Sequence, residues 1–252
     1  MKKILQRIFL VYIMTVFVLV MLILFPFMLI ASLFGKIKGG NMVYTLCTLW
    51  GDICFMMGFA PIKVIYETPH NKKKPCIFVI NHLSYLDAAL LVTVIRQPAR
   101  VLAKAEMKKI PLFGFIYGKA VIAVERDKLS DRAKSLRSVK SLLKKNISVV
   151  VFPEGTFNMT DKPLKEFYNG AFRVAIETQT PIKPVLFLDN FDRMPRNHFH
   201  AVNPGRIRVV YLDEIPVDGM TTADISSLKQ TTFEIMSKKL RDYKASWIKN
   251  DE

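Results

Sequence analysis

The chain has 252 residues, of which 51% are hydrophobic, and its formal net charge at pH 7 is +16. This length allows one α/β domain of ordinary size plus a membrane element. A basic chain suits nucleic acid or an anionic membrane surface, but no zinc-finger spacing or nucleic-acid motif is present. The three cysteines have neither metal-site nor disulfide-framework spacing.

The N-terminal part contains two apolar segments. No charged residue occurs between Ile8 and Gly35, and a second apolar stretch at 41–60 is interrupted only by Asp52. About 20 apolar residues cross a bilayer core, and the first run is too long for a signal peptide. We therefore predict a hydrophobic helical hairpin that spans the bilayer or enters one leaflet. Residues 1–60 would be the membrane-anchoring part, and residues 61–252 a second domain.

Apolar runs and amphipathic stretches alternate along the rest of the chain. This alternation predicts an α/β fold, a three-layer sandwich with a central mixed sheet flanked by helices. Strands are expected at 62–67, 76–80, 100–104, 120–124, 147–152, 182–188 and 206–212. Helices are expected at 85–96, near 111–118, and at 130–146, 170–176 and 222–247, with a polar loop at 189–204.

The first polar motif follows the predicted strand 76–80 and contains His82 and Asp87. On a regular helix, residues five apart point about 140° away from each other. The two side chains meet only if His82 lies in the loop and Asp87 in the next helix's first turn. Ser84 as N-cap and Asp87 at the third helical position would give that arrangement. The alternative is a helix cap beside a polar loop histidine.

The chemistry of such a pair is general-base catalysis. Asp87 would accept a hydrogen bond from one ring nitrogen of His82, and the other nitrogen would take a proton from an attacking hydroxyl. No serine or cysteine nucleophile is evident beside His82. We therefore expect direct attack by a bound acceptor and no covalent enzyme intermediate.

The second polar motif follows the predicted strand 147–152. Pro153 ends that strand, Gly155 permits close backbone approach, and Glu154 could accept hydrogen bonds from substrate hydroxyls. An ordinary turn with a solvated Glu154 is the alternative. Ligands of open α/β sheets bind beyond the carboxyl ends of the strands. We therefore expect both motifs at one edge of the sheet.

Two cations also follow predicted strands. Arg126 comes after 120–124 and suits a bidentate phosphate contact, and Lys104 ends 100–104. Either residue is alternatively an ordinary surface cation. His198 and His200 have no third ligand nearby in the sequence, so no metal site is expected.

Together these segments resemble the glycerolipid acyltransferase family, whose best-known members are 1-acylglycerol-3-phosphate (lysophosphatidic acid) acyltransferases. The resemblance covers about residues 60 to 215. Four blocks stand in the family's order: Asn-His-x-x-x-x-Asp at 81–87, an apolar strand ending in arginine at 121–126, Phe-Pro-Glu-Gly-Thr at 152–156, and a proline-flanked apolar segment at 180–185.

The resemblance implies a role for each matched residue. His82 would deprotonate the acceptor hydroxyl, which attacks an acyl thioester, and Asp87 would orient His82. The substrate-binding residues would be Asn81, Lys104, Arg126, Glu154, Gly155 and Thr156. The site and acyl pocket would be shaped by Pro181, Ile182 and Pro184. No metal or organic cofactor is expected, because acyl-CoA or acyl carrier protein is the donor substrate.

The predicted function is acyl transfer to lysophosphatidic acid, giving phosphatidic acid, by a membrane-bound enzyme of phospholipid synthesis. The expected partners are membrane lipids, the thioester donor and the lysophospholipid acceptor, without nucleic acid. The expected location is the cytoplasmic membrane, with the active site facing the cytoplasmic leaflet.

Two positions depart from the family pattern. Phe157 stands where a basic residue is common, and Ala120 where glycine is usual. Because the missing cation removes one expected anion contact, a different lysolipid acceptor, such as an amino-acid-derived lysolipid, remains an alternative. A non-catalytic protein that binds membrane surfaces is the second alternative.

Overall fold

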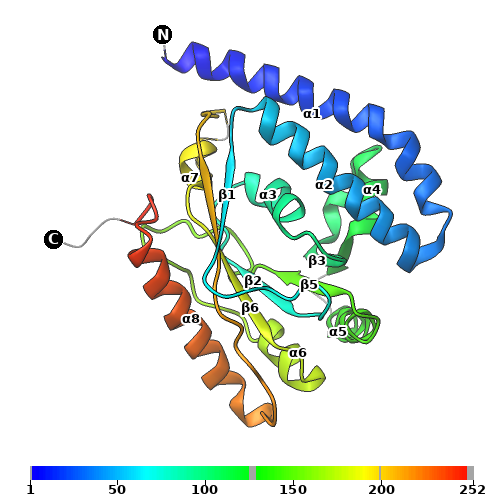
Figure 1. Ribbon diagram of the computed structural model, residues 1–252, viewed down its shortest axis with the longest axis vertical. Helices are drawn as coiled ribbons and strands as arrows, with labels where there is room; N and C mark the ends of the chain where they lie inside the picture. Colours follow the sequence, from blue (N-terminus) through cyan, green and yellow to red (C-terminus); the bar gives the residue numbers. More distant parts are fainter. Residues whose placement is uncertain (1, 125–128, 199, 249–252) are drawn as a thin grey trace.

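Figure 1 shows the computed structural model, which describes residues 2–124, 129–198 and 200–248. Single helical turns lie at Gly35–Gly39, Ala105–Lys109 and Thr222–Asp224. The longer helices are α1 (Lys2–Ser32), α2 (Gly40–Met57), α3 (Leu86–Val94), α4 (Phe113–Ala120), α5 (Leu129–Leu143), α6 (Gly170–Thr178), α7 (Asn190–Arg193) and α8 (Ile225–Asp242). The strands are β1 (Ile62–Tyr66), β2 (Ile77–Ile80), β3 (Ala99–Lys104), β4 (Val121–Val124), β5 (Ser148–Val151), β6 (Ile182–Phe187) and β7 (Ile207–Tyr211).

Within the described residues, the strands form one seven-stranded mixed sheet in the order β1-β7-β6-β2-β5-β3-β4. β2 runs parallel to both of its neighbours, β5 and β6, whereas β7 runs antiparallel to β6. Ile77 is paired with Val149 on one side and with Ile182 on the other. The carboxyl ends of β2, β5 and β6 therefore lie side by side at one edge of the sheet.

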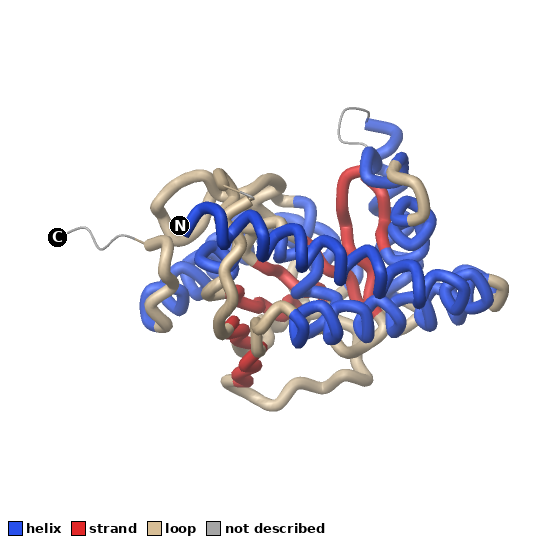
Figure 2. The backbone as a smooth tube through the Cα atoms, turned by 90° about the horizontal axis from the view of Figure 1, so that it is seen from above, coloured by secondary structure: helices blue, strands red, loops and turns tan. Residues whose placement is uncertain are grey.

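The central strands are buried on both faces, which explains why they are continuous apolar runs. Alternate residues of β2 enter two different cores, with Ile77 and Val79 in one and Phe78 and Ile80 in the other. The first core is completed by α5, α6 and α8, and the second by α2 and α3, which lie on opposite sides of the sheet in Figure 1. Figure 2, the view from above, shows α1 running from the N label across the front of the molecule. The predicted three-layer sandwich with a central mixed sheet is confirmed.

The helical hairpin packs on the outside of the second core. The rings of Phe17 in α1 and Trp50 in α2 lie 4.4 Å apart, and Trp50 Nε1 donates to the Phe17 carbonyl at 3.0 Å. α2 in turn contacts α3, where Thr48 Oγ1 donates to the Val92 carbonyl at 2.8 Å. Among the described helices, the stretch Lys3–Ser32 is long and apolar enough to cross a membrane. The domain boundary at residue 60 stays a prediction.

One predicted loop is partly wrong. The segment 189–204 begins with the short helix α7, and its first residue, Asn190, is buried. The cause lies in tertiary contacts, because Asp189 accepts a hydrogen bond from the Arg208 backbone N–H at 2.7 Å and pairs with its guanidinium. The polar composition of this segment therefore predicts neither the short helix nor the burial of its first residue.

Candidate active site

The predicted pair of His82 and Asp87 is assembled at the carboxyl end of β2. His82 Nδ1 lies 2.8 Å from Asp87 Oδ2. The Asp87 side chain is fully buried, whereas 21% of the His82 side chain is exposed. Because the buried carboxylate accepts at Nδ1, the other ring nitrogen, Nε2, is left to accept a proton. General-base catalysis requires a positioned side chain that can accept a proton from the substrate, and Nε2 of this imidazole is such a group.

The loop between the two residues is built around the Asp87 carboxylate. Oδ2 also accepts the backbone N–H groups of Leu83 at 2.7 Å and Ser84 at 2.9 Å. Ser84 Oγ accepts the Leu86 N–H at 3.2 Å, so the two side chains support the start of α3 much as the predicted capping box would. The helix itself begins one residue later than predicted, with Tyr85 at the N-cap position.

Aromatic rings hold the imidazole from two sides. The ring of Phe152 stacks on His82 at 4.1 Å between centroids, and Phe157 meets it edge-on at 4.4 Å. The ring of Tyr85 also meets Phe157 edge-on, with the centroids 4.9 Å apart. Phe157, which occupies the position where a cation was expected, therefore restricts the ring orientation of His82.

Glu154 joins the second motif to the first. Its Oε1 accepts the His82 backbone N–H, and its Oε2 accepts the Lys165 backbone N–H, both at 2.8 Å. The side chain is fully buried. Each oxygen of Glu154 thus accepts a hydrogen bond from a backbone N–H group, and these contacts position the His82 loop. They differ from the predicted hydrogen bonds to substrate hydroxyls.

Burial also makes Glu154 a source of pH-dependent stability. Desolvation raises its pKa to about 8, against the opposing effect of the two backbone N–H groups. The folded protein therefore binds this proton more tightly than the unfolded chain. The resulting stabilisation is fully present below about pH 4.5 and is lost as the pH rises to about 8.

We expect the free energy of unfolding, measured with urea, to fall between about pH 5 and pH 8 by up to ~1.4 kcal/mol per pH unit from this group. In Glu154→Gln, which does not titrate, this fall should be smaller, although the variant is less stable at low pH. Equal pH slopes in the two proteins would show that Glu154 is ionised throughout.

The other residues of the two motifs have different positions. Asn81 is fully buried and exchanges two hydrogen bonds with the Phe187 backbone, so it joins β2 to β6. Gly155 has a left-handed φ of 73°, which favours glycine at this turn. Thr156 is exposed, and its Oγ1 accepts a hydrogen bond from Lys165 Nζ at 2.8 Å. Thr156 and Lys165 thus place polar groups on the surface of this loop.

The fourth block, the proline-flanked segment 180–185, does not lie at the site. Ile182 pairs with Ile77 and Pro184 with Val79, so both precede the level of His82 along the sheet. Pro181 directly precedes β6, at the strand's amino end. The prediction that these residues line an acyl pocket is therefore not supported, because they lie within or before a central strand. Their apolar character serves the core.

The predicted cations are only partly described. Lys104 is the last residue of β3, at the same edge of the sheet as the two motifs, but its side chain lies outside the described part of the chain. Arg126 lies outside the described residues. The phosphate-binding roles of both residues stay predictions.

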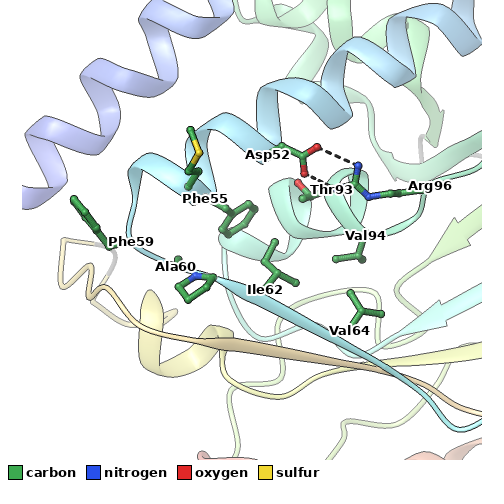
Figure 3. Close-up of a pocket in the computed structure, with 11 residues that line it drawn as sticks. Asp52, Phe55, Phe59, Ala60, Ile62, Val64, Thr93, Val94 and Arg96 are labelled. Atoms are coloured by element: carbon green, nitrogen blue, oxygen red, sulfur yellow. Dashed lines mark hydrogen bonds and ion pairs between the residues drawn. The ribbon is translucent and has the colours of Figure 1, made fainter.

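An apolar cavity of about 440 Å³ begins beside the His82 loop. It lies between α1 and α3 and is lined by side chains that include Ile13, Phe17, Tyr85, Leu86 and Ala89. A second cavity, of about 410 Å³, is shown in Figure 3, where Phe55, Ile62 and Val64 surround it beside the ion pair of Asp52 and Arg96. Neither cavity is lined by a predicted site residue, but Tyr85 and Leu86, which lie between His82 and Asp87 in the chain, line the first one, so it is the better candidate for a substrate chain.

Sequence reasoning missed one buried polar residue of this site. Asn190 Nδ2 donates to Asp87 Oδ1 at 2.7 Å, although the two residues are 103 positions apart. The available signal was the pair of polar residues, Asp189 and Asn190, directly after a strand that neighbours β2. Lys165 was also missed, because nothing in the local sequence indicates its contact with Thr156.

A comparison with family models matches residues 61–188 to the acyltransferase family, a range that contains His82, Asp87 and Glu154. The chain belongs to this family. The expected family resemblance is thereby confirmed, and Asn190 lies just beyond the matched range of this family member.

Individual proteins agree with the family assignment. The chain is 29% identical over 181 residues to an uncharacterized acyltransferase of Schizosaccharomyces pombe, covering 71% of this chain and 64% of that protein. It is 30% identical over 168 residues to the human 1-acyl-sn-glycerol-3-phosphate acyltransferase beta, covering 66% of this chain and 60% of that one. The chain thus spans less than two thirds of the length of these relatives.

A solved structure confirms the fold. The 1-acyl-sn-glycerophosphate (LPA) acyltransferase of Thermotoga maritima superimposes with a TM-score of 0.76, at 23% sequence identity. The match covers 99% of this chain and 100% of that chain. At this identity the likeness establishes the architecture, including the N-terminal apolar helix, and no more.

Proposed function

We propose that this family member transfers a fatty acyl group from a thioester, acyl-CoA or acyl carrier protein, to the hydroxyl of lysophosphatidic acid, giving phosphatidic acid. The observation that carries the proposal is the His82–Asp87 pair, with a 2.8 Å contact at Nδ1 and a partly exposed ring. Relatives named as 1-acyl-sn-glycerol-3-phosphate acyltransferases supply the substrate class.

The proposed mechanism needs only one base. His82 Nε2 takes the proton of the acceptor hydroxyl while the acceptor oxygen attacks the thioester carbonyl carbon. The tetrahedral intermediate then collapses, the C–S bond breaks, and the imidazolium returns the proton to the leaving thiolate. One ester bond forms and one thioester bond breaks, so no metal, redox cofactor or covalent enzyme intermediate is required.

The cavity between α1 and α3 supports the proposal that the second substrate is a lipid. Its lining is almost entirely apolar, and Tyr85 and Leu86 connect it to the loop that carries His82. Apolar burial favours an acyl chain by about 0.8 kcal/mol per CH₂ group. We therefore assign this cavity, in place of the region around Ile182, to the chain of the donor or the acceptor.

The exposed face of α1 supports membrane attachment. Large apolar side chains along this helix, such as Val11, Ile23 and Phe27, are more than half exposed. Contiguous apolar surface of this kind marks contact with a membrane or a protein. The net charge of +16 adds attraction to anionic lipids, at about 1 kcal/mol per basic residue near the surface. We propose attachment to the cytoplasmic membrane with the site facing the cytoplasmic leaflet.

The decisive experiment measures thiol release and lipid product for a matrix of donors and acceptors with the full chain in lipid vesicles. We expect turnover with lysophosphatidic acid and at least one of acyl-CoA and acyl carrier protein. Absence of transfer with every combination would contradict the proposal and favour a membrane-binding protein without catalytic activity.

A second acceptor is favoured by one observation, the aromatic Phe157 at the position where a cation is common. Its edge contact with His82 puts an aromatic ring at that point of the loop. The same matrix therefore includes amino-acid-derived lysolipids. A value of kcat/KM that is highest for lysophosphatidic acid by a wide margin would exclude this alternative.

A further inference from the structure

We infer that Asn190 is a positioning residue of the His82–Asp87 pair, and this inference rests on the proposed function of that pair. Asn190 is the first residue of α7 and is 1% exposed. Its Nδ2 donates to Asp87 Oδ1 at 2.7 Å. The chain His82–Asp87–Asn190 thus joins the ends of two neighbouring strands, β2 and β6.

The two oxygens of Asp87 have different partners. Oδ2 accepts from the His82 ring and from the backbone N–H groups of Leu83 and Ser84. Among the described residues, Asn190 supplies the hydrogen bond recorded at Oδ1. Without that donor, the carboxylate would gain by rotating Oδ1 toward one of the donors at Oδ2, because a buried oxygen without a partner is costly. Asn190 therefore holds the carboxylate in the orientation that presents Oδ2 to His82.

The orientation of the Asn190 amide follows from the same contact. A flipped amide would place its oxygen against Asp87 Oδ1, with two acceptors facing each other. The amide oxygen Oδ1 of Asn190 is buried and has no hydrogen-bond partner among the residues that the structure describes. The Asn190 amide therefore directs its nitrogen to the Asp87 carboxylate, and its oxygen points away from that contact.

The backbone around Asn190 is anchored on both sides. Before it, Asp189 pairs with the Arg208 guanidinium at 2.7 Å, which ties the segment to β7. After it, the Met194 carbonyl accepts a hydrogen bond from Ser84 Oγ at 2.7 Å, which ties the segment to the His82 loop. Such two-sided anchoring gives the precise placement that a positioning residue needs.

The test uses two substitutions with different consequences. Asn190→Leu keeps the approximate size and removes the donor, so we expect kcat to fall by about 10- to 100-fold, with KM for both substrates within about twofold of wild type. Asn190→Asp places a second carboxyl group against Asp87. Like charges at this distance raise the pKa of the introduced group, which remains protonated at low pH and can donate the same hydrogen bond.

The pH dependence separates positioning from a structural role. The ratio of Asn190→Asp activity to wild-type activity should be close to one at low pH. It should fall as the pH rises and the introduced carboxyl group loses the proton that it donates. A constant ratio across the pH range would overturn the inference. This variant also decides the matter if Asn190→Leu does not fold.

A second readout does not require turnover. In the protein without substrate, the NMR signal of the His82 Nδ1 proton should shift or broaden in Asn190→Leu and return in Asn190→Asp at low pH. Thr232→Val is the matched control, because it removes a buried side-chain hydrogen bond in α8, to the Leu228 carbonyl, and none of the hydrogen bonds of Asp87 or Asn190 described above. The control should leave the signal and kcat unchanged.

The two readouts distinguish the failure of this inference from the failure of the proposed function. A signal that responds to Asn190→Leu and not to Thr232→Val supports the positioning role even if no acyl transfer is found. A signal and a kcat that are both unchanged in Asn190→Leu would overturn it, whatever the substrates prove to be.

Discussion

His82→Ala is expected to reduce kcat for acyl transfer by about 10²- to 10⁴-fold, the range that a general base contributes. The substitution removes Nε2, the proposed proton acceptor, while the KM values stay near those of wild type. It should not unfold the protein, because the contact with Glu154 is made by the backbone N–H of residue 82, which alanine retains. Thiol release from a thioester donor in the presence of lysophosphatidic acid measures the effect.

A matched control is available in the same chain. His198 is exposed, and its ring lies near that of His200. His198→Ala should retain wild-type turnover, so a loss confined to His82→Ala identifies the site. Near-normal turnover of His82→Ala would show that the acceptor hydroxyl loses its proton to another group, and the general-base assignment would then be wrong.

The sequence predicts the part of this site that depends on contacts between residues close together in the chain. His82 and Asp87 are five positions apart, and their meeting requires only a loop followed by the first turn of a helix, which the local residues encode. The parallel arrangement of β2 and β5 was also foreseeable from the alternation of strands and helices. Both motifs were therefore correctly expected at one edge of the sheet.

The remaining features depend on long-range contacts that no local pattern contains. The sequence predicts that Glu154 contacts substrate, but in the structure its two oxygens accept hydrogen bonds from the backbone N–H groups of His82 and Lys165. Asn190 lies in a stretch with loop composition, and its burial follows from contacts with Asp87 and from the anchoring of Asp189 on β7. The proline-flanked block at 180–185 is predicted to shape the acyl pocket, yet strand pairing places Ile182 in the core. Strand order and side-chain pairing decide all three cases.

Asp87→Asn is the second substitution with a large expected effect, a fall in kcat of about 10³-fold. The amide can still accept the backbone N–H groups of Leu83 and Ser84 through one oxygen, so the loop should retain its shape. The negative charge that stabilises the imidazolium formed during transfer is lost. The nitrogen of the new amide would face the Asn190 donor, unless the Asn190 amide turns over and accepts through its oxygen, which has no partner in the described part of the chain.

The measurement is kcat and KM for donor and acceptor together with the free energy of unfolding in urea. Asp218→Asn, at an exposed position, is the matched control and should change none of these quantities. Asp87→Ala should be less stable than Asp87→Asn, because it leaves several buried donors without a partner, at about 1–3 kcal/mol each. If Asp87→Asn kept its turnover while Asp87→Ala lost only stability, the carboxylate would serve the start of α3 and not the base. A large loss of kcat in Asp87→Asn with little loss of stability assigns the charge itself to catalysis, because the hydrogen-bonded framework of the loop is then still in place.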